Sequence, residues 1–193
     1  MLKQRITTPA FMKALLTIIK SIDSFTETVG KVSAYFSVLM VLVTCYIVVT
    51  RYIFNTGSIA VQESIIYFNA LLFLVTAAFT LKHNGHVRVD IIYSTASSRY
   101  RAWVDLLGGI FLLIPVSVFI LWASWDYVMS SWSVLEKSGE AGGLPYVYIL
   151  KSLILVMGFT VILQGIADIL RNALRLFTDE PSLSMPEEEG SIL

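Results

Sequence analysis

Two histidines stand out as possible metal ligands, because they lie close together directly after an apolar run. His83 and His86 are three residues apart in "FTLKHNGHVRVDIIY", a spacing that places both rings on one face of a helix. Gly85 lies between them, however, and neither a cysteine nor a close pair of carboxylates completes a ligand set. A metal site is therefore not expected. A haem site is not expected either, because no histidine lies inside an apolar run.

Glu63 and Arg51 are ionisable residues at the ends of two neighbouring apolar runs. Such a residue in a membrane-spanning segment is costly and is a candidate functional site by default. Two interpretations of Glu63 stay open: an ion pair with Arg51 that clamps a helical hairpin, which we favour, and a proton or ion site. Lys151 lies within the first turns of a later apolar helix, where it either snorkels toward water or meets Asp126 or Glu136.

Other catalytic patterns are missing from the sequence, which has no nucleophile elbow, phosphate-binding glycine loop or metalloprotease motif. Fourteen basic and fourteen acidic residues cancel, so the overall charge does not indicate binding to nucleic acid. The single cysteine, Cys45, cannot form an internal disulfide, and we expect it to serve in packing. We expect a protein that is not an enzyme and needs no cofactor of its own.

Composition and apolar runs predict an all-α membrane protein. Of the 193 residues, 56% are hydrophobic and only 15% are charged. A helix needs about 20 mainly apolar residues to cross the hydrocarbon core, and its backbone hydrogen bonds are then satisfied internally. The sequence predicts a four-helix transmembrane domain over residues 32–170, with spans at about 32–51, 61–82, 104–126 and 146–169.

Three flanking segments have different characters. Residues 1–31 lack the features of a cleaved signal peptide and repeat apolar residues at helical spacing from Phe11 to Val29. They are predicted to form an amphipathic anchor in the cytoplasmic membrane interface, the alternative being a helix packed on a soluble partner. A shorter interfacial helix is predicted between the second and third spans, from Asp90 toward Tyr100. Residues 171–193 form an acidic, proline-containing tail that is predicted to be disordered.

Lysine and arginine residues predict the orientation of the spans. With the N-terminus in the cytoplasm, eleven of them fall on the cytoplasmic side and three on the other, a strong positive-inside bias. Both termini and the "KHNGHVRVD" segment are therefore expected in the cytoplasm. Within the spans, Pro115 predicts a kink, and four glycines predict close helix contacts. These glycines are Gly108, Gly109, Gly158 and Gly165.

The order of four sequence features resembles a known family. "RYIFN" closes the first span, "QESIIYF" opens the second, "GHVRVD" follows it, and "SWSVLEKSGEAGGLPYVYILKSLI" enters the fourth helix. Together they resemble the small permease subunit, of the DctQ type, of tripartite ATP-independent periplasmic (TRAP) transporters. The resemblance covers roughly residues 20–177 and includes a branch often linked to organic-acid uptake.

The resemblance implies a subunit of the bacterial inner membrane that scaffolds a large elevator-type membrane subunit. That partner would carry the sodium and substrate sites, and a periplasmic substrate-binding protein would deliver an organic acid. Membrane lipid is a further expected partner. Two alternatives stay open: a self-contained four-helix proton-coupled exporter, and a membrane adaptor without a transport role.

The resemblance also assigns roles to individual side chains. Gly85 would end the second helix, His86 and Arg88 would face headgroups or the large subunit, and Asp90 would cap the next helix. The outer loop would help to receive the binding protein through three charged residues. These are Glu136, Lys137 and Glu140.

Overall fold

The computed structural model describes residues 10–86 and 96–177, and this part of the chain is helical without any strand. Four helical stretches are long and apolar enough to cross a membrane, which confirms the predicted fold class. The elements in chain order are α1 (Ala10–Tyr52), α2 (Ile59–Val75), α3 (Ala77–Lys82), α5 (Ser98–Gly108), the π-helical segment η1 (Gly109–Leu113), α6 (Ile114–Ser133) and α7 (Val147–Phe177).

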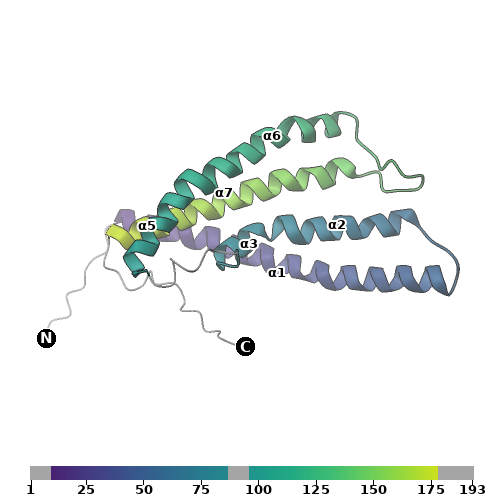
Figure 1. Cartoon of the computed structure of the whole chain (residues 1–193), viewed down its shortest axis with the longest axis horizontal. Coiled ribbons are helices and arrows are strands. Elements are labelled where there is room, and N and C mark those ends of the chain that lie inside the picture. The colour runs from purple at the N-terminus through teal and green to yellow at the C-terminus, as the bar shows by residue number, and fades with distance from the viewer. Residues whose placement is uncertain (1–9, 87–95, 178–193) are drawn as a thin grey trace.

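The helices run up and down along one long axis, with α7 between α6 and the hairpin of α1 and α2 (Figure 1). We call one end of this bundle the terminal end, because the start of α1, the start of α5 and the end of α7 lie there; α3 runs toward this end and finishes beside the middle of α1. The other end, with the α1–α2 turn and the α6–α7 loop, is the loop end. Helix α6 packs along α7, so α7 is the central element of the fold.

Helix α1 is a single helix of 43 residues, where the sequence indicated an anchor up to residue 31 followed by a separate span. Its most buried side chains, Ile19, Thr26 and Ser33, recur every seven residues and form one face. On the expected apolar stripe, Phe11 remains 75% exposed and Phe25 50% exposed. The first half of α1 therefore packs on the chain through a neighbouring face and leaves part of its apolar stripe uncovered.

The second span is interrupted at Thr76, which separates α2 from α3 and whose hydroxyl donates to the carbonyl of Leu72. At the end of α3, the Asn84 N–H donates to Leu81 O at 3.1 Å and the Gly85 N–H donates to Thr80 O at 2.8 Å. This is the Schellman pattern, in which one left-handed residue terminates a helix. That residue is Asn84, with φ 53°, and not Gly85 as predicted; Gly85 contributes the second N–H donor.

The third span, in which a kink was predicted at Pro115, contains a π-helical segment directly before this proline. Pro115 lies in the first turn of α6, directly after the π-helical segment η1. Proline has no N–H to donate and its ring crowds the preceding turn, and a π segment widens the helix at such a place. At the terminal end, α5 begins after Ser97, whose hydroxyl accepts from the Tyr100 N–H at 3.3 Å. This helix continues into the third span. Residues 90–95 of the interfacial helix predicted from Asp90 toward Tyr100 lie outside the described part of the chain, so that helix stays a prediction.

Close helix contacts occur at three of the four predicted glycines. A Cβ added at any of the three would lie 2.7 Å from a side-chain carbon of a neighbouring helix, which leaves no room for it. These pairs are Gly109 with Ile169, Gly158 with Leu121 and Gly165 with Leu113. Gly108 is the exception, because nothing lies within 4 Å of its added Cβ.

Candidate functional site

The terminal end contains a group of charged side chains that joins α1 to α7. The Arg171 guanidinium donates through Nη2 to Asp23 Oδ1 at 2.8 Å and Oδ2 at 2.7 Å, and through Nη1 to Asp168. Gln164, which has no exposed surface, donates through Nε2 to Asp23 Oδ1 at 3.1 Å. We call these four residues the terminal clamp. A bidentate, charge-assisted contact of this kind fixes both the distance and the rotation of two helices.

A second charged group lies beside the terminal clamp and joins α1 to the end of α3. Glu27 Oε2 accepts from Lys82 Nζ at 2.6 Å and lies 2.8 Å from His83 Nε2. Lys82 Nζ also donates to the backbone oxygen of Asp23 at 3.1 Å, so the two groups meet on α1. His83 thus contacts a carboxylate across the helix pair. Across residues 10–86 and 96–177, no group of three or more His, Cys, Asp or Glu side chains has the geometry to hold a metal.

Glu63 binds the α6–α7 loop at the loop end. Its Oε2 accepts from the Leu144 N–H at 2.6 Å, and its Oε1 accepts from the Ser138 hydroxyl. A Cβ added at Gly143 would lie 2.8 Å from Glu63 Oε1, so only glycine lets the loop backbone come this close. We call Glu63, Ser138 and Leu144 the loop clamp.

The favoured ion pair between Arg51 and Glu63 is therefore wrong. Both oxygens of the Glu63 carboxylate are occupied by the loop, which approaches from the side of α6 and α7. Arg51 instead lines a cavity between the end of α1 and the start of α2. In the described part of the chain, no side chain or backbone group pairs with its guanidinium.

Lys151 meets Glu136, one of the two partners considered for it. Its Nζ lies 2.5 Å from Glu136 Oε2 and 4.0 Å from the centre of the Tyr127 ring. The Lys151 ammonium holds the pKa of the Glu136 carboxyl below its usual range. Nearby, Trp132 Nε1 donates to Ser152 Oγ at 2.8 Å, which joins the end of α6 to the start of α7.

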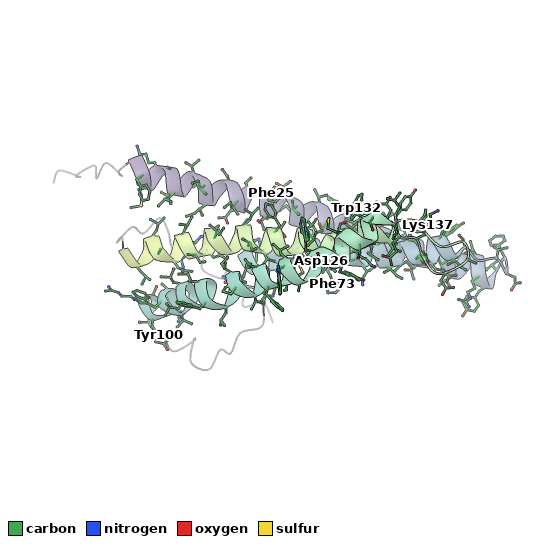
Figure 2. All side chains as sticks on the ribbon, turned by 90° about the horizontal axis from the view of Figure 1, so that it is seen from above. Phe25, Phe73, Tyr100, Asp126, Trp132 and Lys137 are labelled. Atoms are coloured by element: carbon green, nitrogen blue, oxygen red, sulfur yellow. The ribbon has the colours of Figure 1, made fainter. Side chains whose placement is uncertain are left out.

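The remaining predicted site residues are exposed or lie outside the described ranges. His86 is exposed directly after α3, whereas Arg88 and Asp90 fall among residues 87–95, outside the described part. Lys137 and Glu140 are exposed on the α6–α7 loop. Figure 2 shows Tyr100 toward the terminal end, and Trp132 and Lys137 toward the loop end.

The terminal clamp was missed by the sequence analysis, although its spacing was visible. Gln164, Asp168 and Arg171 are four and three residues apart, which places them on one face of α7. Asp23 lies four residues after Ile19 and three before Thr26, within the face that α1 buries. Polar residues that recur at helical spacing in apolar segments were the available signal for a contact between these two helices.

Helix α6 keeps a large apolar face uncovered, and this face includes a carboxylate. Phe119 is 60% exposed, Trp122 is 74% exposed and Trp125 is 55% exposed. Asp126 follows them inside the third candidate span and is exposed as well. Among residues 10–86 and 96–177, no cation or hydrogen-bond donor contacts this carboxylate. The polar groups described above thus hold the helices together at both ends, whereas Asp126 contacts none of them in the described part of the chain.

The family model of the tripartite ATP-independent periplasmic transporters, DctQ component, matches residues 40–175. A relative from Vibrio cholerae serotype O1 (strain ATCC 39315 / El Tor Inaba N16961), the C4-dicarboxylate TRAP transporter small permease protein DctQ, is 29% identical over 107 residues. That alignment covers 55% of this chain and 46% of the relative, so the chain spans about half the relative's length. No solved structure matches significantly.

The family match covers the turn after α1, the later described helices up to residue 175 of α7 and both contacts of Glu63. It begins within α1, so Asp23 and Glu27 lie before the matched region while Arg171 lies inside it. With four helices suited to cross a bilayer, the protein is a multi-pass membrane protein. The chain belongs to the family of DctQ components, the small permease subunits, of tripartite ATP-independent periplasmic transporters.

Proposed function

We propose that this chain is a fixed scaffold for the large membrane subunit of a TRAP transporter. The large subunit would carry the sodium and substrate sites and move against this scaffold, and a periplasmic binding protein would deliver an organic acid. The relative from Vibrio cholerae is named for C4-dicarboxylates, and we extend that substrate class to this chain as part of the proposal. Sodium would be bound by the large partner.

The observation that carries this proposal is the uncovered face of α6 with Asp126. A carboxylate inside a membrane span is costly unless a cation, a hydrogen-bond donor or water reaches it. Asp126 has no such partner in the described part of the chain, and its neighbours Trp122 and Trp125 are largely exposed. A membrane helix of a larger subunit that presents a lysine or arginine would satisfy the carboxylate and cover the aromatic side chains.

The clamps support a rigid role for the rest of the chain. A proton-coupled exporter would need a carboxylate that is free to exchange protons, but Glu63 accepts two hydrogen bonds from the α6–α7 loop. A membrane adaptor without a transport role would share the anchored helices. The family match favours the transporter subunit over that alternative.

The orientation of the scaffold follows from its charges. Lys31, Lys82 and Arg171 are among the cations near the terminal end, and the positive-inside bias favours that end in the cytoplasm. The loop end would then face the periplasm of a bacterial inner membrane, where a binding protein docks. Within the α6–α7 loop, Lys137 and Glu140 are the exposed charges available for such docking.

Purification through a tag on this chain in mild detergent tests the scaffold role. A large polytopic membrane protein should accompany the chain in a fixed ratio, as measured by mass spectrometry. Asp126→Asn should reduce this recovery, because the amide keeps the side-chain shape and removes the charge. Glu140→Gln is the matched control, since it removes an exposed carboxylate outside the spans and should leave recovery unchanged.

Two results would contradict the scaffold proposal. One is a chain that purifies alone and drives proton-dependent efflux from liposomes, which would support the exporter. The other is equal recovery of the large protein with Asp126→Asn, which would remove the observation on which the proposal rests. Sodium-gradient-driven uptake of a dicarboxylate by proteoliposomes with all three components, and its loss without this chain, would support the complete assignment.

Docking of the binding protein is tested separately at the loop end. Charge reversal at Glu140 should weaken the docking, and this effect should decrease as salt is raised, because exposed charges are screened. Glu136, which the sequence also suggested for docking, is less suitable for this test, since its charge reversal would also break the contact with Lys151. Equal binding by the Glu140→Lys chain would remove this loop residue from the docking surface.

A further inference from the structure

The turn between α1 and α2 borders a partly open cavity of about 180 Å³ at the loop end. Its walls come from the last turns of α1, the turn itself and the first turn of α2, and we call it the hairpin cavity. The lining residues are Tyr46, Ile47, Thr50, Arg51, Thr56, Gly57, Ser58, Val61 and Gln62. A second, more open hollow of about 530 Å³ adjoins it and shares Arg51, Thr56, Gly57 and Gln62.

Of the described residues that line either hollow, only Arg51 is charged, and none is a carboxylate. Its guanidinium has no partner in the described part of the chain, and the carboxylate closest in sequence, Glu63, is held by the loop clamp. An arginine fork with five free N–H groups matches the oxygens of a phosphate or carboxylate. The hairpin cavity is thus a concave polar site with one positive charge that no residue in the described part of the chain neutralises.

The neutral groups of the hairpin cavity fit an anion as well. The Ser58 and Gln62 side chains have no hydrogen-bond partner among the described residues. Thr50 offers less, because its hydroxyl donates to the backbone oxygens of Tyr46 and Ile47 within α1. Free hydroxyl and amide groups around a guanidinium can share the oxygens of one anionic group.

The level of the hairpin cavity in the membrane indicates which kind of anionic ligand it binds. The first candidate span ends at Tyr52 and the second begins at Ile59, so Arg51 lies where the apolar helices end. Tyr46 is 58% exposed and Tyr52 is 77% exposed, and tyrosines are enriched at the level of lipid headgroups. Ile47 and Val61 line the cavity toward the apolar part of the spans. A ligand with an anionic head and apolar chains matches this order of groups.

We propose that the hairpin cavity binds the headgroup of an anionic phospholipid, with Arg51 on the phosphodiester. A zwitterionic phospholipid fits less well, because its amine would find no carboxylate among the lining residues. The bound lipid would occupy the leaflet at the loop end and brace the α1–α2 turn. This inference concerns the chain alone and does not depend on the proposed transport role.

Lipid titration of the full chain in mild detergent tests the site. The probe is dioleoylphosphatidylglycerol, with bound lipid counted by native mass spectrometry and the thermal midpoint measured in parallel. Arg51→Gln should weaken binding on the order of tenfold, and Arg51→Lys should lie between, since lysine keeps the charge without the fork. Lys137→Gln is the matched control, because it removes an exposed cation at the same end but outside the cavity.

A steric variant tests the same site without touching the charge. A Cβ added at Gly57 would lie 3.6 Å from Gln62 Nε2, an ordinary contact, so Gly57→Leu should fold and fill the cavity. It should weaken phosphatidylglycerol binding although Arg51 remains. Binding by Gly57→Leu that equals the unmodified chain would overturn the proposed position of the headgroup.

Matched ligands separate the phospholipid from other sources of the same chemistry. Dioleoylglycerol, which has the chains without the phosphate, should bind weakly, and equal binding would reduce the site to ordinary contact with bilayer lipid. Inorganic phosphate that bound as tightly as the lipid would assign a free-anion site instead. If Arg51→Gln released the large subunit but kept its phosphatidylglycerol, a carboxylate of that subunit would be the occupant and the lipid proposal would fail.

Discussion

The two ends of the bundle are held by different kinds of polar contact. At the terminal end, Asp23 and Arg171, which are 148 residues apart in the chain, join α1 to α7, and the Arg171 side chain is only 13% exposed. At the loop end, Glu63 joins a helix to a loop through Ser138 and Leu144. The terminal clamp thus fixes helices relative to each other, whereas the loop clamp fixes a loop on helices that are already packed.

Because the two clamps join different elements, loss of each clamp should change the structure in a different way. Loss of the terminal clamp should loosen the contact between the first half of α1 and α7. The apolar contact of Ile19 with Leu174, which lies beside the clamp, would then have to hold the two helices by itself. Loss of the loop clamp should free the α6–α7 loop without separating the helices, since α6 and α7 also meet at Gly158 and Gly165 and through Trp132 and Ser152.

Arg171→Met should be the most destabilising of these changes. It leaves Asp23 and Asp168 without their shared cation in a mostly buried position, which costs about 3–5 kcal/mol in comparable pairs. Thermal unfolding followed by tryptophan fluorescence in detergent measures the loss. Adding Asp23→Asn and Asp168→Asn should restore part of it, and a midpoint equal to that of the unmodified chain would contradict the terminal clamp.

Gly30→Ala should follow in size. Its Cβ would lie 2.2 Å from Phe79 Cδ2 and 2.4 Å from Phe79 Cγ, so α1 and α3 must move apart, at a cost of about 1–3 kcal/mol. Gly108→Ala is the matched control, because its Cβ meets nothing within 4 Å and alanine favours the helix by about 1 kcal/mol. Equal unfolding midpoints for the two variants would show that the α1–α3 contact is not tight.

Glu63→Gln should act on the α6–α7 loop rather than on the bundle. The amide keeps one acceptor oxygen, so either the Ser138 hydroxyl or the Leu144 N–H loses its partner. Hydrogen exchange should become faster in residues 134–146 and stay unchanged around Asp23 and Arg171. Glu140→Gln, in the same loop, is the control for charge removal.

If Glu63 is a proton or ion site, Glu63→Gln should give a different result when hydrogen exchange, transport and assembly are measured together. Unchanged loop exchange together with abolished transport would support a proton or ion site, the interpretation that the sequence left open. Faster exchange together with weaker assembly would support the loop clamp.

Glu136→Gln should have the smallest effect, and that effect should disappear in acid. The folded chain lowers the pKa of Glu136, so the pair with Lys151 contributes fully above the usual glutamate pKa. That contribution is lost as pH falls through the lowered pKa. The difference in unfolding midpoint between the unmodified chain and Glu136→Gln should be constant from pH 7 to 5 and shrink below about pH 4. A difference that grew in acid would contradict the pairing.

Contacts between residues that are close in the chain could be predicted from the sequence. Lys151 and Glu136 are 15 residues apart on either side of one loop, so a short connection brings them together. Pro115 disturbs its own helix for the same reason, through a backbone donor that proline lacks. The pair of Arg51 and Glu63 looked equally local, but it failed because the α6–α7 loop competes for the same carboxylate.

The sequence alone determined the four spans, the helical class and the resemblance to small TRAP permease subunits. These depend on the length and composition of apolar runs, which the thickness of a bilayer converts directly into helices. Only the tertiary structure decided that Asp23 meets Arg171, that Glu63 holds Leu144 and that Arg51 faces an open cavity. Such pairings depend on how distant helices are rotated and shifted along their axes when they pack. The hydropathy of a single sequence specifies neither the rotation nor the shift.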